Sequence, residues 1–287
     1  MSAIKINSTK NIRKGAIFHY APFILHCLFP EIINEVYQYD TVYREKVLDK
    51  TIGKLSKIYD EVMEAESIEL DTIDYNNLDL KTIECEFNRS YLNRVTFDRF
   101  RDYVFSRYNI NPLDYDDKYP EVLLIKRSDR VELIDDDQLK DQLPKAPINK
   151  DEQYIDGYQL HNASPEALRY HFLVSNGKDR REIDRVDDVE SYLQYKYRDR
   201  FKSVMFEFLP FLEQIKYYNN AKIIISVHGG CQVNQLFCKE QTKIVEIEAN
   251  GKKFEPFDQI SNILNLNHVK CRDNKFESIV NFIENEL

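Results

Sequence analysis

The fold of this chain is decided by the stretch Ala221-Lys-Ile-Ile-Ile-Ser-Val-His-Gly-Gly-Cys-Gln-Val-Asn-Gln-Leu-Phe237. It begins with an apolar run that is typical of a buried strand and continues into a pattern that is typical of a helix. A second apolar run follows at Lys243-Ile-Val-Glu-Ile-Glu248. The succession of strand, His-Gly-Gly turn, helix and strand predicts an α/β domain with a parallel sheet.

The His-Gly-Gly turn is also a candidate ligand site. Gly229 and Gly230 would let the backbone turn sharply and come close to a bound group. The helix that follows would offer free N–H groups, and the positive end of its dipole, to an anion such as a diphosphate. His228 could add a hydrogen bond to a phosphate or a ribose. An ordinary turn with a buried histidine explains the same residues equally well.

Composition narrows the class of protein. The chain has 287 residues, of which 43% are hydrophobic, so it can build one large domain or two of ordinary size. Its net charge of −9 argues against a nucleic-acid partner. Five cysteines without a C-x-x-C pair favour neither a disulfide framework nor a zinc site. We find no signal peptide and no transmembrane segment, and we expect a soluble protein in a reducing cytoplasm.

Two domains are expected along the chain. Residues 1–118 form a helix-rich N-terminal domain, with helical spacing of apolar residues over 16–40 and 41–70, and they end in a Pro- and Asp-rich linker. Residues 119–270 alternate strands and helices and carry a polar insertion at 129–176. The segment 271–287 is an amphipathic helix that could cross back to the N-terminal domain.

Several short segments in the second half of the chain follow one another in a recognisable order. They are Asp179-Arg-Arg-Glu-Ile183, Phe211-Leu-Glu-Gln-Ile215, His228-Gly-Gly with Asn234 and Leu236-Phe237, and Ile244-Val-Glu-Ile247. In this order and spacing, the region from about Gly177 to Leu266 resembles glycosyltransferase family 61. That family includes β-1,2-xylosyltransferases and protein O-GlcNAc transferases. The chain is similar to it as a remote relative.

The resemblance implies a GT-B fold, in which two Rossmann-like domains face a cleft. The C-terminal domain would bind a nucleotide sugar and the N-terminal domain would bind the acceptor. We therefore expect an inverting, metal-independent glycosyltransferase with no cofactor. The donor would be a UDP-sugar, with xylose or N-acetylglucosamine as the transferred sugar, and the acceptor would be a glycan hydroxyl. Without an anchor, such an enzyme would suit a microbial cell or a virus-infected one.

Donor contacts are predicted from residues near the ends of strands. Arg127 follows the apolar run Glu121-Val-Leu-Leu-Ile125, and Arg180 and Arg181 lie in the Arg-rich turn. A guanidinium can hold two phosphate oxygens at once, so these arginines are candidates for the diphosphate. Arg180 and Arg181 could equally belong to a solvated run of charges.

Two further polar residues are candidates in the same region. Asn234 could bind the phosphate or the base, or could merely cap the turn. Glu246 could accept hydrogen bonds from ribose hydroxyls, or could be a surface carboxylate beside Glu248.

The general base is sought among the histidines of the first domain. Family members carry a His-x-x-x-Asp/Glu pattern on a helix there, and the stretch Tyr20–Pro30 aligns with it. Pro22 stands at the histidine position and His26 at the acidic one. Histidine titrates near neutral pH, so we rank His26 first and His19 second as catalytic bases. A packed helix histidine is the alternative.

Three other functions were weighed. A metal-dependent enzyme would need an Asp-x-Asp motif, which Asp114-Tyr-Asp116 and Asp135-Asp-Asp137 both spell. The second is better explained as a helix cap, and the first lies in the linker. A non-catalytic interaction scaffold would use the charged segment 41–70 as its surface. A phosphate-ester hydrolase would use His228 as nucleophile or base, and the sequence shows neither a metal cluster nor a partnered acid nearby.

Overall fold

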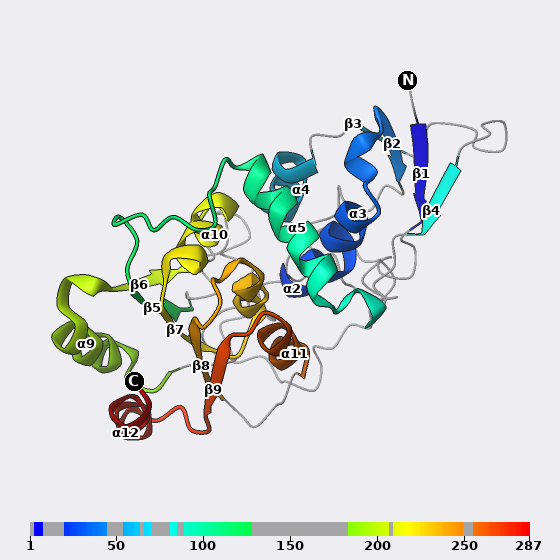
Figure 1. Cartoon of the computed structure of the whole chain (residues 1–287). Helices are drawn as coiled ribbons and strands as arrows, with labels where there is room; N and C mark the ends of the chain where they lie inside the picture. Colours follow the sequence, from blue (N-terminus) through cyan, green and yellow to red (C-terminus); the bar gives the residue numbers. More distant parts are fainter. Residues whose placement is uncertain are drawn as a thin grey trace, which may run out of the picture. The chain divides into compact units, whose positions relative to one another are not determined.

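The computed structural model describes residues 3–7, 20–44, 54–63, 66–69, 81–84, 89–127, 183–206, 209–248 and 255–287. These residues fall into two compact units (Figure 1). Unit 1 contains the described residues up to Arg107, and unit 2 contains those from Tyr108 onward. The chain thus divides after Arg107, whereas the sequence analysis placed the division after residue 118. The predicted insertion at 129–176 lies outside the described residues.

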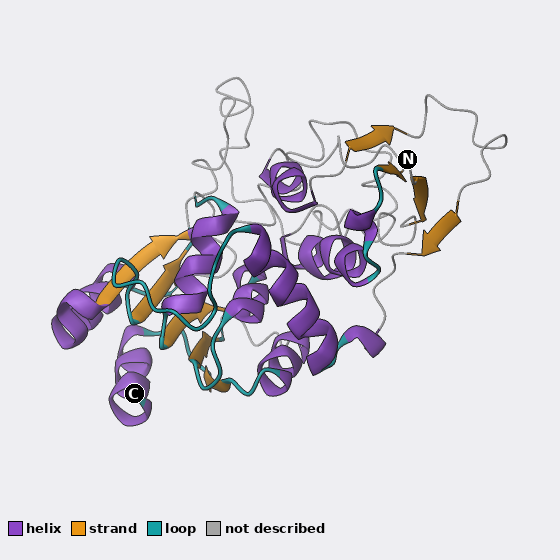
Figure 2. Cartoon of the chain, turned by 45° about the horizontal axis from the view of Figure 1, so that its top comes forward, coloured by secondary structure: helices purple, strands orange, loops and turns teal. Residues whose placement is uncertain are grey.

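Within its described part, unit 2 contains a five-stranded parallel sheet with the strand order β6-β5-β7-β8-β9 (Figures 1 and 2). The strands are β5 (Val122–Lys126), β6 (Phe201–Met205), β7 (Ile223–Val227), β8 (Lys243–Ile247) and β9 (Asn267–Cys271). The parallel sheet predicted from the apolar runs is confirmed. The edge strand β9 was not predicted.

Helices cover both faces of this sheet. On one face, α9 (Val186–Tyr197) and α12 (Phe276–Glu286) pack against alternate strand residues and build the apolar core. Leu193 of α9 and Ile283 of α12 are fully buried there. On the other face lie α10 (Phe211–Asn220), α11 (Glu255–Ile263) and the 3₁₀ helix η12 (Gly230–Phe237). The 3₁₀ turn η10 (Arg198–Arg200) leads from α9 into β6.

The strand order reverses direction once. From β5 the chain crosses to β6 on one side, and then returns to place β7 on the other side of β5. In open parallel sheets, the carboxyl ends of the strands at such a reversal form a crevice that binds ligands. Here that position lies between the ends of β5 and β7. Arg127 follows the first strand directly, and His228 follows the second.

Unit 1 contains a second parallel sheet, with the order β3-β2-β1-β4 among its described strands. They are β1 (Ala3–Asn7), β2 (Thr41–Arg44), β3 (Glu66–Glu69) and β4 (Lys81–Glu84). The helical pattern expected over 41–70 is therefore wrong in part. Among the residues described in this stretch, only α4 (Lys54–Met63) is helical. The β-branched and aromatic residues of Thr41-Val-Tyr-Arg44 favour the strand β2.

The other helices in the described part of unit 1 are short except for one. The chain forms α2 (Tyr20–Phe23), the π-helical turn η2 (Ile24–Leu28), α3 (Phe29–Ile33) and the 3₁₀ turn η3 (Val36–Gln38). A second 3₁₀ turn, η7 (Arg89–Tyr91), precedes the long helix α5 (Arg94–Arg107). Phe29 of α3 packs edge-on against Phe97 of α5, with ring centroids 5.7 Å apart.

The terminal helix α12 belongs to the core of unit 2. Its buried residues Ile279 and Ile283 pack in the same cluster as Val189 and Leu193 of α9. None of the helices within the described ranges has both the length and the apolar character that crossing a bilayer requires.

Candidate functional site

Arg127 and Gly229 lie side by side at the reversal of the strand order. A Cβ atom built on Gly229 would meet Nη2 of Arg127 at 3.7 Å and its Cζ at 3.9 Å. Nη1 of Arg127 is buried, and it has no hydrogen-bond partner among the residues that the structure describes. A buried guanidinium nitrogen without an acceptor is costly. The arrangement therefore indicates a place for an anionic or carbonyl oxygen beside the glycine.

The chain bends at His228 and Gly229, where the sequence analysis expected a turn, but Gly229 takes part in this bend without a left-handed conformation. Its backbone is fully extended, with φ 178° and ψ 179°, a conformation open to any residue. Its role in this structure is to leave room, because a side chain would lie against Arg127. Gly230 begins the segment that follows.

That segment is a 3₁₀ helix, η12, and not the α-helix that the sequence analysis assumed. Its first backbone bond runs from the N–H of Gln232 to the carbonyl of Gly229, at 3.0 Å. The side chains of Gln232 and Gln235 are fully buried in it. Oε1 of Gln232 and Nε2 of Gln235 have no partner within the described part of the chain. Among the described residues, Gln232 and Gln235 of η12 thus join Arg127 in having a buried polar atom without a partner.

Glu246 joins two histidines from neighbouring strands. Its Oε1 lies 2.5 Å from Nδ1 of His228, and its Oε2 lies 2.9 Å from Nε2 of His268. The side chain of Glu246 is only 1% exposed. The alternative of a surface carboxylate beside Glu248 is therefore wrong. Glu246 is buried because β8 is an interior strand, and the register places Glu246 opposite Ser226 on β7 and Lys270 on β9.

The two histidines keep Glu246 ionised. Burial alone would raise the pKa of its carboxyl group, but the hydrogen bonds from His228 and His268 outweigh burial and lower the pKa to about 2. Lys270, whose Nζ lies 4.0 Å from Oε2, contributes in the same direction. An ionised carboxylate can only accept hydrogen bonds, so the nitrogens that face it are both donors.

The network continues from His268 into the helices. Nδ1 of His268 lies 3.0 Å from the hydroxyl of Ser261 on α11, which in turn donates to Oε1 of Gln235 on η12. Buried polar atoms of β7, β8, β9, α11 and η12 are thus linked in one chain. The chain returns to the same 3₁₀ helix that follows the His-Gly-Gly turn.

Glu246, Asp258 and His268 bring possible metal-ligand atoms within 4.8 Å of one another. These atoms already bond to partners of the network, and Nζ of Lys270 lies 2.7 Å from Oδ2 of Asp258. A metal ion would have to share this space with an ammonium group. We therefore interpret the cluster as a hydrogen-bond and ion-pair network.

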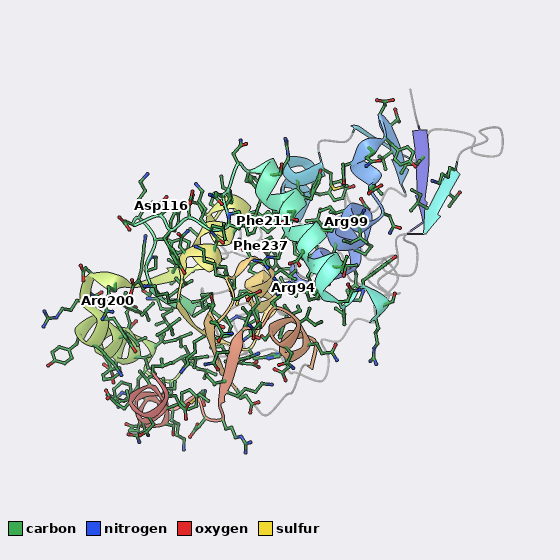
Figure 3. All side chains as sticks on the ribbon, viewed as in Figure 1. Arg94, Arg99, Asp116, Arg200, Phe211 and Phe237 are labelled. Atoms are coloured by element: carbon green, nitrogen blue, oxygen red, sulfur yellow. The ribbon has the colours of Figure 1, made fainter. Side chains whose placement is uncertain are left out.

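Asn234 lies one turn further along η12 and is fully buried. Its amide donates to Oε1 of Gln214 on α10, at 3.1 Å. Nearby, Phe211 of α10 and Phe237 of η12 pack edge to face with ring centroids 5.8 Å apart (Figure 3). Asn234 thus helps to fasten η12 to α10, and its predicted contact with a donor stays a prediction.

The profile of the family described as Glycosyltransferase 61 matches residues 23–245, which is most of the chain. The chain belongs to glycosyltransferase family 61. A search of curated proteins found no match. Membership gives the protein its general activity, the transfer of a sugar from a donor to an acceptor. The more specific likeness to xylosyltransferases or O-GlcNAc transferases stays a prediction.

The family match spans both units. Of the predicted donor contacts, the structure brings together Arg127, which follows β5, His228 and Gly229, which follow β7, and Glu246 of the adjacent strand β8. Arg180 and Arg181 lie outside the described residues, as does the second candidate base, His19.

His26 lies in unit 1, in the π-helical turn Ile24–Leu28, and is partly buried. The N–H of Phe29 bonds there to the carbonyl of Ile24. Turns of this kind are rare in proteins, and those that do occur often lie at functional sites. Five residues later, the buried carboxylate of Glu31 accepts a hydrogen bond from Tyr59 of α4. Neither Glu31 nor Tyr59 was predicted from the sequence as a functional residue.

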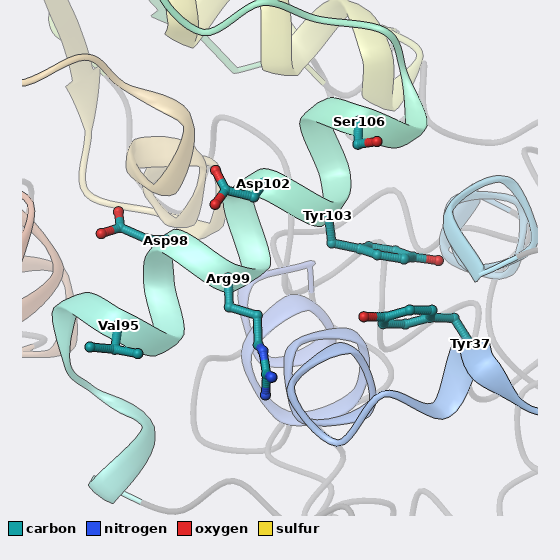
Figure 4. A pocket seen from close by; sticks show the side chains of 7 residues that line it. All are labelled: Tyr37, Val95, Asp98, Arg99, Asp102, Tyr103 and Ser106. Carbon is teal, nitrogen blue, oxygen red and sulfur yellow. The ribbon is translucent and has the colours of Figure 1, made fainter.

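Unit 1 also carries an open pocket of about 580 Å³ (Figure 4). Seven residues of η3 and α5 line it: Tyr37, Val95, Asp98, Arg99, Asp102, Tyr103 and Ser106. The rings of Tyr37 and Tyr103 stack with centroids 4.2 Å apart. Asp98 and Arg99 are engaged in ion pairs with Arg94 and Glu35. Aromatic rings beside carboxylate and hydroxyl groups suit a polyhydroxylated ligand.

Residues of the network beyond Glu246 were missed from the sequence. His268 and Lys270 lie two apart on β9, so they share one sheet face with Glu246. The alternation of polar and apolar residues in Asn267-His-Val-Lys-Cys271 was the available signal. It was overlooked because the stretch is short and follows a helix.

Proposed function

We propose that this member of family 61 is an inverting, metal-independent glycosyltransferase that uses a UDP-sugar. It would transfer xylose or N-acetylglucosamine to a hydroxyl of a glycan acceptor. Unit 2 would hold the donor at the reversal of its strand order. Unit 1 would hold the acceptor.

One observation is the main support for this location of the donor site. Nη1 of Arg127 is buried without a described partner, directly beside the side-chain-free Gly229 at the ends of β5 and β7. A diphosphate oxygen placed between them would meet both the guanidinium and the backbone of the glycine-rich segment. The buried nitrogen would then gain an acceptor, which none of the described residues provides.

The reaction requires a negative charge to be stabilised on the leaving nucleotide. An inverting transfer is one displacement, in which an acceptor oxygen attacks the anomeric carbon as the diphosphate leaves. Arg127 and His228 stand where they could contact that diphosphate, and fixed donors of this kind stabilise charge that develops in the transition state. Lys270 is engaged with Asp258 at 2.7 Å and is assigned no contact with the donor.

A metal ion is not needed in this scheme. The Asp114-Tyr-Asp116 motif lies in the turns between α5 and β5, where the carbonyl of Asp114 accepts a bond from Lys239. Asp135-Asp-Asp137 lies outside the described residues. We therefore expect transfer to survive excess chelator, with inhibition by chelator as the contrary result.

The acceptor would bind to unit 1. His26 is proposed as the general base, because it lies in the π-helical turn and because the family resemblance points to that helix. The pocket offers the exposed carboxylate of Asp102 to sugar hydroxyls, and the rings of Tyr37 and Tyr103 add apolar surface for the C–H bonds of a sugar. Asp102→Asn should raise the KM for the acceptor without changing the affinity for the nucleotide.

The first experiment is a thermal-shift scan with UDP, GDP, ADP and their sugars. A ligand that binds only the folded protein raises the unfolding temperature by mass action. We expect a shift with UDP, followed by transfer or slow donor hydrolysis with one UDP-sugar. A scaffold would show no shift with any nucleotide at millimolar concentration. A phosphate-ester hydrolase would release inorganic phosphate and transfer no sugar.

A further inference from the structure

A buried chain of hydrogen bonds holds the ring of His228. Glu246 is held from one side by Nδ1 of His228 at 2.5 Å, and from the other by Nε2 of His268 at 2.9 Å. Each oxygen of the carboxylate thus serves one imidazole. The carboxylate cannot rotate without breaking one bond, so the position of His228 depends on a residue one strand further away.

The chemistry of the carboxylate fixes the tautomer of His228. An ionised carboxylate has no hydrogen to give, so the hydrogen of the Nδ1–Oε1 contact is on Nδ1. The nitrogen that Glu246 does not engage is Nε2, and it is the one that a phosphate or a ribose hydroxyl would meet. Catalytic triads use a buried carboxylate in the same way to set the tautomer and orientation of an imidazole.

His268 is itself held from several sides. The hydroxyl of Ser261 lies 3.0 Å from its Nδ1, and Oδ1 of Asp258 lies 3.4 Å from the same atom. Its side chain is only 5% exposed, on the sheet face covered by α11. Lys270 and Asp258 pair at the rim of the network. An alanine at position 268 would leave Oε2 of Glu246 buried without its imidazole partner.

We propose that His268 is a positioning residue for the transfer reaction. It would hold Glu246 and, through it, present His228 to the leaving diphosphate with Nδ1 as the donor to Glu246. The consequence for transfer rests on the proposed function. The effect on the ring of His228 does not, because it is a property of the ligand-free protein.

The test compares His268→Ala with His268→Gln. The glutamine amide can donate a hydrogen bond to Glu246 from a position similar to that of Nε2, whereas alanine cannot. Nitrogen NMR of ¹⁵N-histidine-labelled protein reports which ring nitrogen of His228 carries hydrogen, with the signal assigned by its loss in His228→Gln. The affinity for UDP and the rate of transfer are measured on the same samples.

We expect the wild type and His268→Gln to show His228 with hydrogen on Nδ1. His268→Ala should show mixed tautomers and should bind UDP more weakly by about tenfold. Rescue by glutamine separates positioning from a general loss of packing, since both variants remove the ring. If the spectrum of His228 and the affinity for UDP are unchanged in His268→Ala, the inference is wrong. A glutamine variant as impaired as the alanine variant overturns it as well.

Failure of the proposed function would look different. In that case the wild-type protein would bind no nucleotide, while the ring of His228 would still respond to position 268. Conversely, wild-type binding of UDP with an indifferent His268 would leave the donor site standing and remove only the positioning role.

Discussion

Replacing Arg127 with methionine would remove the guanidinium at the end of β5 while keeping most of the length of the side chain. In the free protein, Nη1 of this residue is buried and unpartnered within the described structure, beside Gly229. If the space beside Nη1 is a diphosphate site, Arg127 favours ligand binding and lowers the stability of the ligand-free protein. Its loss should then affect binding and stability in opposite directions.

The magnitudes follow from the two states of the guanidinium. A hydrogen bond from a charged donor contributes about 1.5–3 kcal/mol, so UDP should bind Arg127→Met about 10- to 150-fold more weakly. A buried donor without an acceptor costs about 1–3 kcal/mol, and methionine removes that cost. Loss of some packing offsets part of the gain. We therefore expect the unfolding temperature of the free variant to stay within about 3 °C of the wild type, or to rise.

Calorimetric titration with UDP and thermal unfolding without ligand measure the two effects. Arg200→Met is the matched control, because it removes the same charge at the opposite, amino-terminal end of the sheet, just before β6 (Figure 3). Arg200 is exposed and lies 3.6 Å from Glu121. An exposed pair of this kind contributes little, so the control should change neither quantity appreciably.

Two results would refute the reasoning. Equal affinity of Arg127→Met and the wild type for UDP would mean that the guanidinium does not contact the nucleotide. A fall of many degrees in the unfolding temperature would mean that Arg127 has a structural partner that the described residues do not contain. If Arg200→Met also bound UDP more weakly, the loss of affinity in Arg127→Met would reflect the change in net charge and not a specific contact.

Three other outcomes are expected. Gly229→Ala should fold normally, since the added Cβ lies at an ordinary 3.7 Å from Arg127, but titration should show UDP bound on the order of tenfold more weakly because the methyl group occupies the proposed phosphate position. Glu246 has a lowered pKa in the folded state, so it stabilises the fold above about pH 4.3 and loses this contribution of about 3 kcal/mol as the pH falls toward 2. Urea titrations should therefore show the stability difference between the wild type and Glu246→Gln shrinking between pH 5 and about pH 3, and a constant difference would contradict the ionised state. His26→Ala should keep its affinity for UDP and lose transfer by about a hundredfold or more, and near-normal turnover would reject it as the base.

The central strands of unit 2 were predictable because a strand that is buried on both faces has a nearly continuous apolar sequence. The runs Val122–Lys126, Ile223–Val227 and Lys243–Ile247 are almost continuously apolar, as expected for the interior of a parallel sheet. The edge strand Asn267–Cys271 has one neighbour and alternates in polarity, so it has no continuous apolar run. The helix Arg94–Arg107 was also missed, because charged residues surround its few buried phenylalanines.

The donor site was predictable in its parts and not in its arrangement. Arg127 and His228 could be picked from the sequence because each follows a strand, and carboxyl ends of parallel strands meet at one edge. That β5 and β7 are neighbours depends on the crossover to β6, which no local pattern encodes. The extended backbone at Gly229 and the 3₁₀ helix after it likewise result from packing, since the residues themselves permit several turns.

The network behind His228 shows why the polar residues of this sheet face need a functional explanation. Removing a carboxylate from water costs several kcal/mol, and an apolar residue at position 246 would cover α11 and η12 without that cost. The sequence instead places His228 directly after β7, Glu246 on β8 and His268 on β9, in a register that satisfies both carboxylate oxygens. Such groups are found where a charge or a tautomer has to be fixed. His228 is followed by Gly229, which lies next to Arg127, and Nη1 of Arg127 has no partner among the described residues. The ligand of the network is therefore expected at the same edge of the sheet.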